Sequence, residues 1–397
     1  MIPRPSARMC VSILAAMSVA ESAKSGVWVT EPVLGLVGNY STNPGLLYTE
    51  HTAQTVAAVL LDSPTTYHAN DMSLSIQPSF RLSSTSGYSS LASDYAHLTS
   101  TWELDSERNR VSVTGEVARD SSLYYDYLVN GGTGVRRDTT VADVTWVREL
   151  TERWNFNWDL NSSRVIYGQS SSFTSLTDYH YSTAAPGISW QLSEQTKLTL
   201  LGNVSVYDSS GGATKSVNSN IEVGGTRQLT ELWSLTADVG YSHEANTISE
   251  YYGPYLLGTF RSTNSGSVFS ANLTHQAELL AVTATASRSN VPTGFAFLAH
   301  QTAYGLSFDY PRTARWTFDG HVRRVTSVEP AAPGSTINQS YSTWDWGLSA
   351  AWLFTEKWTM TFAASRVTAK YTPPDVSVGS SGFTIQLSRR FNRIEWH

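Results

Sequence analysis

The chain is poor in cysteine and in recognisable metal or phosphate motifs. Its only cysteine among 397 residues is Cys10, so no disulfide can form within the chain. The nine histidines stand at spacings unlike those of metal ligands, and the sequence has neither a glycine-rich phosphate loop nor a His-Glu-x-x-His motif. We therefore expect no metal and no other cofactor, and no reaction that depends on a thiol.

Charge and long apolar runs are also scarce. Only 15% of the residues are Asp, Glu, Lys or Arg, whereas about a quarter is usual in soluble domains. The formal net charge of -6 offers no basic surface to a nucleic acid. Beyond residue 20, no stretch stays apolar over the roughly 18 residues that a membrane-spanning helix needs. The sequence therefore predicts no transmembrane helix.

The first twenty residues have the pattern of a secretory signal peptide. Arg4 and Arg8 give a positive start, and a short apolar run follows over residues 9–20. This run ends in Ser18-Val19-Ala20, which fits a small-x-small cleavage site. We expect residues 1–20 to be removed, which leaves a mature chain without cysteine. The alternative is a buried N-terminal helix.

Aromatic residues, by contrast, make up 12% of the chain, and they alternate with polar residues. Large apolar side chains follow the turn Thr151-Glu152-Arg153 at every second position, and polar side chains fill the positions between them. The apolar set is Trp154, Phe156, Trp158 and Leu160, and the polar set is Asn155, Asn157, Asp159 and Asn161. Successive side chains of a strand face opposite sides, so one face is apolar and the other polar. Similar segments follow residues 230–231 and 355–357.

Two kinds of connection separate these segments. Short ones carry Glu or Arg and are followed by Trp or another large apolar residue, whereas long ones are rich in Gly, Ser, Asn and Tyr. Residues 248–264 and 290–300 are among the long ones. Bacterial outer-membrane barrels have short periplasmic turns and long extracellular loops. The alternation therefore predicts that both ends of the barrel lie in the periplasm, with an aromatic girdle beside the short turns.

The fold predicted from this pattern is all-β: a transmembrane up-and-down antiparallel β-barrel of about 16 strands over residues 72–397. The competing interpretation is a soluble β-sandwich with the tryptophans in its core. Residues 21–71 are expected to be a periplasmic lead, a plug or an extra strand at residues 33–40. Such a strand needs a partner, which we place within residues 83–94, so 18 strands are also allowed. The sixteen segments are residues 72–82, 95–104, 110–119, 139–149, 154–166, 179–192, 197–207, 217–229, 232–243, 265–275, 279–289, 301–310, 315–325, 341–354, 358–370 and 380–391.

The last predicted strand has a signal of its own. Ser380 and Gly382 precede apolar residues at alternate positions, Phe383, Ile385 and Leu387, which resembles the assembly signal of outer-membrane barrels. The chain departs from that signal in its tail, residues 388–397, where such strands usually end on an aromatic residue. The signal implies that the barrel assembly machinery is a partner during insertion.

Several short motifs are spread along the first half of the chain. They are Ala118-Arg119-Asp120-Ser121-Ser122, Arg136-Arg137, Leu150-Thr151-Glu152-Arg153, Tyr167-Gly168, Leu176-Thr177-Asp178-Tyr179 and Leu192-Ser193-Glu194-Gln195, together with Asn43-Pro44. By these features residues 119–208 resemble the second group of β-barrel porin families of Gram-negative outer membranes. That resemblance implies an outer-membrane barrel and little about cargo, because the family is largely of unassigned function and some relatives are linked with exopolysaccharide or secretion systems.

Function is then expected to reside in the lumen, as a porin-like channel that passes or exports hydrophilic solutes, with saccharides as candidate cargo. The alternation turns a set of mostly acidic side chains inward, which favours a mild preference for cations. These selectivity candidates are Glu116, Asp143, Asp159, Glu222, Asp238, Asp319, His321 and Arg323. Expected partners are membrane lipid, lipopolysaccharide and a polysaccharide.

Two alternatives to a channel stay open. One is a closed barrel that acts as a structural or surface-interaction protein. The other is an outer-membrane hydrolase, which would need a Ser–His contact on the lipid face near the outer rim. The aromatic connection over residues 248–264 has several interpretations: an inward constriction, a surface that stacks on sugars, a contact at the outer rim, or packing on neighbouring loops.

Overall fold

The computed structural model describes residues 26–46, 52–87, 94–121, 135–168, 176–210, 214–252, 255–328, 340–372 and 375–396. These residues form twenty-one strands in one sheet, in which all pairings are antiparallel. No helix within these ranges is long and apolar enough to cross a membrane. The expected signal peptide, residues 1–20, lies outside the described residues.

Sixteen long strands coincide with the sixteen predicted segments, which confirms them. They are β5 (Met72–Gly87), β6 (Tyr95–Ser106), β7 (Asn109–Ser121), β8 (Arg136–Glu149), β9 (Trp154–Tyr167), β10 (Tyr179–Ser193), β11 (Thr196–Ser209), β12 (Thr214–Gln228), β13 (Trp233–Tyr252), β14 (Tyr255–Gln276), β15 (Ala281–Pro292), β16 (Leu298–Thr313), β17 (Trp316–Val328), β18 (Ser340–Thr355), β19 (Trp358–Thr372) and β20 (Val376–Arg390).

The remaining strands add two more crossings of the wall. They are β1 (Val27–Thr30), β2 (Val33–Ser41), β3 (Gln54–Asp62), β4 (Thr65–Ala69) and β21 (Ile394–Trp396). β1 continues β2, β4 continues β3, and β21 continues β20. Pro32 and Pro64 stand at the first two breaks, where a missing N–H interrupts the ladder of hydrogen bonds. The barrel therefore has 18 strands, against the 16 expected first.

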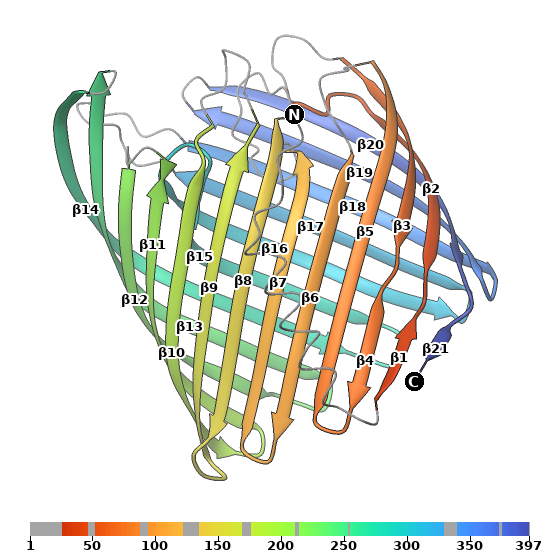
Figure 1. The fold of residues 1–397 in the computed structure, drawn as a ribbon, viewed down its shortest axis with the longest axis horizontal. Helices are drawn as coiled ribbons and strands as arrows, with labels where there is room; N and C mark the ends of the chain where they lie inside the picture. Colours follow the sequence, from red (N-terminus) through yellow and green to blue (C-terminus); the bar gives the residue numbers. More distant parts are fainter. Residues whose placement is uncertain are drawn as a thin grey trace.

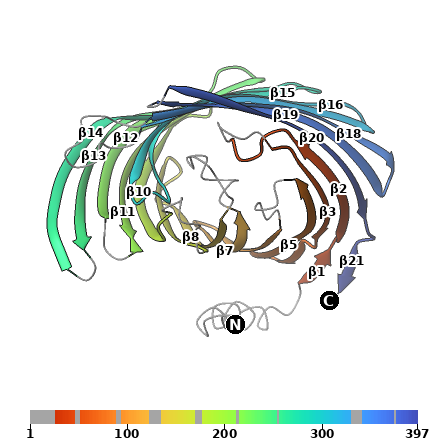
Figure 2. The ribbon, with the colours of Figure 1, turned by 90° about the horizontal axis from the view of Figure 1, so that it is seen from above.

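The first strand of the wall meets the last, and this pairing closes the ring. β2 pairs with β20 from Val33↔Arg390 to Ser41↔Gly382, and its other neighbour is β3. The partner expected within residues 83–94 is wrong, because residues up to Gly87 belong to β5. Figure 1 shows the strands tilted around the ring, and Figure 2 shows the ring from above. The tail continues β20 in the same direction as β21, where Trp396 stacks on Trp28.

The short turns explain why one sequence unit recurs. Thr151 Oγ1 accepts a hydrogen bond from Trp154 N at 3.1 Å, and this places the indole at the start of β9. The same bond joins a threonine to the tryptophan three residues later in three other turns. Those copies are Thr230–Trp233 at 3.1 Å, Thr313–Trp316 at 3.0 Å and Thr355–Trp358 at 3.1 Å.

These tryptophans form an aromatic row on the outer face at the short-turn end. Trp154 stacks on Trp190, and Trp316 stacks on Trp352, each pair with ring centroids 5.6 Å apart. Trp154 is 40% exposed and Trp352 37% exposed in the isolated chain. A soluble sandwich would bury these indoles between two sheets, so the sandwich interpretation is wrong. Their place is that of a girdle at a membrane interface.

The aromatic connection over residues 248–264 is not a loop. β13 and β14 continue through it and pair from Trp233↔His275 up to Tyr252↔Tyr255, so the segment is the end of a long hairpin. In Figure 1 this hairpin stands at the upper left of the barrel. The interpretation of these residues as an inward constriction is therefore wrong.

Candidate functional site: the lumen and its constriction

Burial shows which face of each strand lines the lumen, because side chains can be buried only inside the ring. On β11, Tyr207 is fully buried, whereas Val204 is 49% exposed among the apolar side chains of the outer face. Cross-strand pairs share a face, so the inward side can be followed from strand to strand. By this rule all eight predicted selectivity residues face the lumen, from Glu116 on β7 to Arg323 on β17.

Three of these residues form a diagonal on the inner face of β7, β8 and β9. Glu116 on β7 is opposite a residue two positions from Asp143 on β8, and Asp143 is opposite a residue two positions from Asp159 on β9. Asn161 Nδ2 donates to Asp143 Oδ2 at 3.3 Å. Neutral partners leave the negative charge in place, so this wall presents carboxylates to the lumen.

A second acidic pair lies on β12 and β13. Glu222 is directly opposite Gly240, and Asp238 is directly opposite Gly224, so the two carboxylates occupy neighbouring rows. Asn220 Nδ2 donates to Glu222 Oε1 at 2.5 Å, and Ser270 Oγ donates to Asp238 Oδ2 at 3.0 Å. Neither contact brings a compensating cation.

The third group lies across the lumen. β17 is nine strands along the ring from β8, which is half of the 18. It carries Asp319, His321 and Arg323 on its inner face. His321 Nε2 is 3.7 Å from Asp345 Oδ2 on β18, and Ser349 donates a hydrogen bond to Asp319. This wall mixes both signs of charge, whereas the wall around β8 is acidic.

All eight residues lie near the middle of their strands, between the fourth and the eighth residue counted from the short turns. Asp159 is the sixth residue of β9, and Asp238 is the sixth residue of β13. On β17, which starts at Trp316, His321 holds the same position. The structure thus brings the predicted residues together as a belt around one level of the lumen. At this level the charge of a passing solute would interact most strongly with charged side chains of the wall.

Above the belt, which means toward the long connections, the end of β15 and the start of β16 leave the wall. We call residues 290–298, which form this part of the chain, the strap. β14 and β15 pair only from Arg288 downward, so the upper part of β15 is not held by β14. Asn290 Nδ2 instead donates to Asn218 Oδ1 on β12 at 3.1 Å and to Glu244 Oε2 on β13 at 3.3 Å. The strap therefore crosses the inner faces of β12 and β13.

The far end of the strap packs on the inner faces of β9, β10 and β11. Tyr207 Oη donates to the carbonyl oxygen of Thr293 at 3.0 Å, and Thr177 N donates to the carbonyl oxygen of Gly294 at 2.7 Å. Leu298 is fully buried in an apolar cluster at this point. The other buried members of that cluster are Val135, Val165, Tyr167, Tyr179 and Tyr207. The strap is thus fixed to the wall both at its base, through Asn290, and at its tip, through Thr293 and Gly294.

Local contacts give the strap its shape. Thr293 Oγ1 donates to the carbonyl oxygen of Phe297 at 2.9 Å, which closes a tight turn. Within the turn Ala296 takes the left-handed φ of 65°, which is uncommon for a residue with a side chain. A Cβ on Gly294 would lie 2.6 Å from Tyr167 Oη, so glycine is needed for this approach.

A buried polar cluster ties the strap to the hairpin β13–β14. Glu244 is 1% exposed, and its Oε1 has no hydrogen-bond partner among the described residues. His300 is hydrogen-bonded to Asn290 through Nδ1 and to Asn264 through Nε2, both at 2.5 Å. The Nε2 atom of His300 is also 3.8 Å from Glu244 Oε2. Alternation alone turns Glu244 inward, but the contacts of this cluster depend on the strap and were missed from sequence.

A second connection also narrows the rim from inside. Leu46 follows β2 with φ of 49° and is buried on the inner face of β19 and β20. Its buried neighbours are Ala369, Tyr371 and Val378. The described part of residues 21–71 thus lies in the wall or packs against its inner face.

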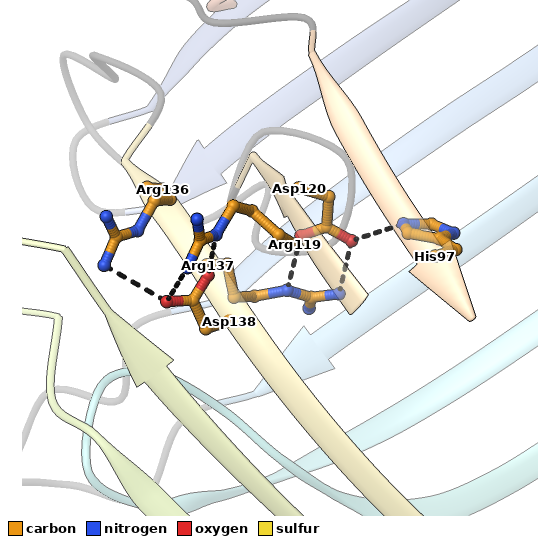
Figure 3. Close-up of polar contacts among 6 residues, drawn as sticks. All are labelled: His97, Arg119, Asp120, Arg136, Arg137 and Asp138. Carbon is orange, nitrogen blue, oxygen red and sulfur yellow. Dashed lines mark hydrogen bonds and ion pairs between the residues drawn. The ribbon is translucent and has the colours of Figure 1, made fainter. Parts of the chain in front are cut away.

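At the upper end of β7 and β8, charged residues pair on both faces of the wall (Figure 3). On the inner face, Arg137 Nε donates to Asp120 Oδ1 at 3.1 Å, and His97 Nε2 is 3.6 Å from Asp120 Oδ2. On the outer face, Asp138 lies between two arginines, Arg119 at 2.7 Å and Arg136 at 3.1 Å. The inner pair is buried, whereas both arginines of the outer group are exposed and Asp138 is half-buried.

This difference predicts unequal costs of mutation. Arg137→Ala leaves the buried carboxylate of Asp120 without its cation, and we expect it to destabilise the barrel by about 3–5 kcal/mol. Arg119→Ala is the matched control on the outer face, where Asp138 keeps Arg136, and we expect a loss of less than about 1 kcal/mol. Equilibrium unfolding in urea from lipid vesicles measures both, and equal losses would contradict the assignment.

Only hydrocarbon outside the ring and water inside it reconcile an exposed apolar face with charged residues on the other face. The chain is therefore a porin-like β-barrel of the bacterial outer membrane. Both described ends of the wall, Val27 and Trp396, lie at the short-turn end, as the sequence predicted.

Solved structures of similar fold come from Pseudomonas aeruginosa. The outer membrane protein OpdK has 10% sequence identity and a TM-score of 0.48, over 93% of this chain and 99% of that chain. OccK2 (OpdF) in complex with glucuronate has 9% identity and a TM-score of 0.47, over 92% and 98%. OpdQ has 10% identity and a TM-score of 0.46, over 93% and 99%. Neither a protein-family model nor a curated protein matches the chain.

Proposed function

We propose that the protein is a channel through which small hydrophilic solutes cross the outer membrane, with saccharides as candidate cargo and with a preference for cations. The observation that carries this proposal is the belt of mostly acidic side chains around one level of the lumen. Polar walls lower the cost of admitting hydrated solutes, and carboxylates attract cations. Lumen width and charge then do the work, and no chemical bond changes.

The strap adds a limit on size. It fills part of the cross-section above the belt, and buried contacts at both of its ends hold it there. A solute must pass beside the strap before it meets the carboxylates. This order of filters favours compact polar solutes over long polymers.

Planar-bilayer recording tests the proposal. The purified, folded protein is expected to give discrete conductance steps, and the heat-unfolded protein none. Liposome swelling should then separate saccharides by size, with monosaccharides entering faster than oligosaccharides. If the folded barrel inserts but gives no conductance, it is not a channel, and the closed-barrel alternative takes its place.

A second candidate function rests on one contact. Ser162 Oγ lies 3.0 Å from His180 Nε2 on the outer face near the upper rim, and Asp208 stands opposite His180 on β11. A hydrolase needs such a nucleophile and base, with an acid that orients the imidazole. Among the described residues, however, histidine–carboxylate pairs within 4.0 Å involve only His97, His300 and His321. The pair at His180 therefore lacks its third member.

A fluorophosphonate probe separates the two functions. Covalent labelling that disappears in Ser162→Ala would establish the hydrolase. A folded barrel that takes no label, while it conducts ions in a bilayer, supports the channel alone.

A further inference from the structure

The outer face of β16–β19 carries a patch of aromatic and basic side chains at one level. Tyr304, Arg324 and Trp344 are direct cross-strand neighbours on β16, β17 and β18. Trp346 is two residues further along β18, and Arg366 on β19 lies opposite it. All five side chains are exposed in the isolated chain. We call these five residues the outer patch.

The patch lies at the upper edge of the apolar band. On β18 the outward indoles Trp352 and Trp344 are eight residues apart, which corresponds to about 27 Å along the strand. A tilt of about 40° reduces that distance to roughly 20 Å of height, close to the ~25 Å of an outer-membrane apolar band. Trp352 belongs to the row beside the short turns, so Trp344 and its neighbours stand at the opposite, extracellular interface.

The two arginines of the patch have no acidic partner. No ion pair within 4.0 Å involves Arg324 or Arg366 among the described residues, whereas the rim arginines Arg119 and Arg136 share Asp138. The Arg324 guanidinium instead lies 5.4 Å from the ring centroid of Trp344. Stacking on an aromatic ring holds a guanidinium in place and leaves its N–H groups free to bind an anion.

We propose that the outer patch binds the phosphorylated sugar headgroup of lipopolysaccharide in the outer leaflet. Arg324 and Arg366 would hold phosphate oxygens, because a guanidinium fits phosphate in a two-point contact. Adjacent strands are about 4.8 Å apart, and the two arginines lie two strands apart and two residues apart along the strands, so they span about 12 Å, a distance suited to one phosphorylated headgroup. Trp344, Trp346 and Tyr304 would lie between the sugars and the acyl chains, where amphipathic rings prefer to be. The proposal does not depend on whether the lumen conducts.

The test is a binding titration of the purified full-length barrel with lipid A that carries its phosphates. For the double variant Arg324→Ala/Arg366→Ala we expect affinity to fall roughly tenfold to thirtyfold, since each surface arginine near an anionic lipid contributes about one kcal/mol. Arg323→Ala is the matched control, because it removes the same charge one residue away on the lumen face. That control should bind like the wild type.

Two further binding measurements identify the chemical group that the patch binds. Dephosphorylated lipid A should bind the wild-type barrel about as weakly as lipid A binds the double variant, and inorganic phosphate should compete poorly. Equal binding of the dephosphorylated lipid, or an equal loss in Arg323→Ala, would overturn the proposal. Strong competition by inorganic phosphate would reduce it to a simple anion site and overturn the glycolipid assignment. Heat-modifiable migration on a gel verifies folding. If the alanine variant does not fold, the same titration is made with Arg324→Gln/Arg366→Gln, for which we expect the same loss of affinity.

Discussion

Replacement of residues 292–298 by a two-residue Asn-Gly turn is expected to raise the single-channel conductance roughly twofold or more. The change joins the paired residues Val291 and Ala299 and removes the part of the strap that covers β9–β11. Ion flow through a wide barrel is limited by its narrowest section, and we expect the strap to form that section above the belt. Planar-bilayer recording in potassium chloride measures the effect.

The matched control shortens the hairpin β13–β14 at its end by a similar number of residues. The shortened part lies beyond Glu244 and Asn264, the hairpin residues that contact the strap and its neighbour His300, so the strap stays in place. Its conductance should equal that of the wild type. If both variants conduct like the wild type, the strap does not set the resistance of the channel.

Reversal of two lumen charges should convert the ion preference. In Asp159→Lys/Asp238→Lys, two carboxylates on different walls become ammonium groups at the level where solutes meet the most charge. Under a tenfold salt gradient, a perfectly selective pore would develop about 59 mV. We expect the reversal potential to move by roughly 20 mV or more on that scale, from the cation side to the anion side.

Asp208→Lys is the control for charge reversal. Asp208 lies next to Tyr207 on β11, and because Tyr207 faces the lumen, Asp208 faces outward. The same chemical change is then made outside the conduction path, and the reversal potential should stay where it is. A shift in this control as large as that in the lumen variant would mean that total charge, not lumen charge, sets the preference.

The strands could be predicted because lipid and water impose opposite demands on alternate residues. β12 is an example: Ile221 and Val223 face outward with Glu222 between them, and the sequence alone showed this. The same alternation turned the selectivity candidates inward, and the structure agrees for each. Their role in selectivity stays a prediction until currents are measured.

The first two crossings of the wall were harder to recognise. On β3 the inward positions Val56 and Ala58 are buried and apolar, so both faces of that strand are apolar. The alternation of apolar and polar residues is lost where other parts of the chain, and not water, cover the inward face of a strand, because apolar side chains are then favourable on both faces. β3 therefore did not appear as a membrane strand, and the partner of β2 was sought in the wrong place.

The strap could not be predicted for a different reason. Residues 290–300 were interpreted as an ordinary surface connection. Phe295, Phe297 and Leu298 make the segment apolar, but composition does not say which part of the wall it contacts. Its position depends on contacts such as that between Tyr207 and Thr293, which are 86 residues apart. The hairpin over residues 248–264 was mistaken for a loop because its aromatic content suggested a binding surface. In the chain, cross-strand pairing continues through it.

The junction between β2 and β20 has a consequence for biogenesis. Asn39 and Thr384 are hydrogen-bonded at 2.8 Å although they are 345 residues apart in the chain. The two ends of the sheet must therefore remain open until nearly the whole polypeptide has been exported. Throughout that time, two rows of backbone donors and acceptors would be exposed to water or to other nascent chains. A truncation that removes either end strand should thus leave an open curved sheet with unpaired edges, which is prone to aggregation and proteolysis.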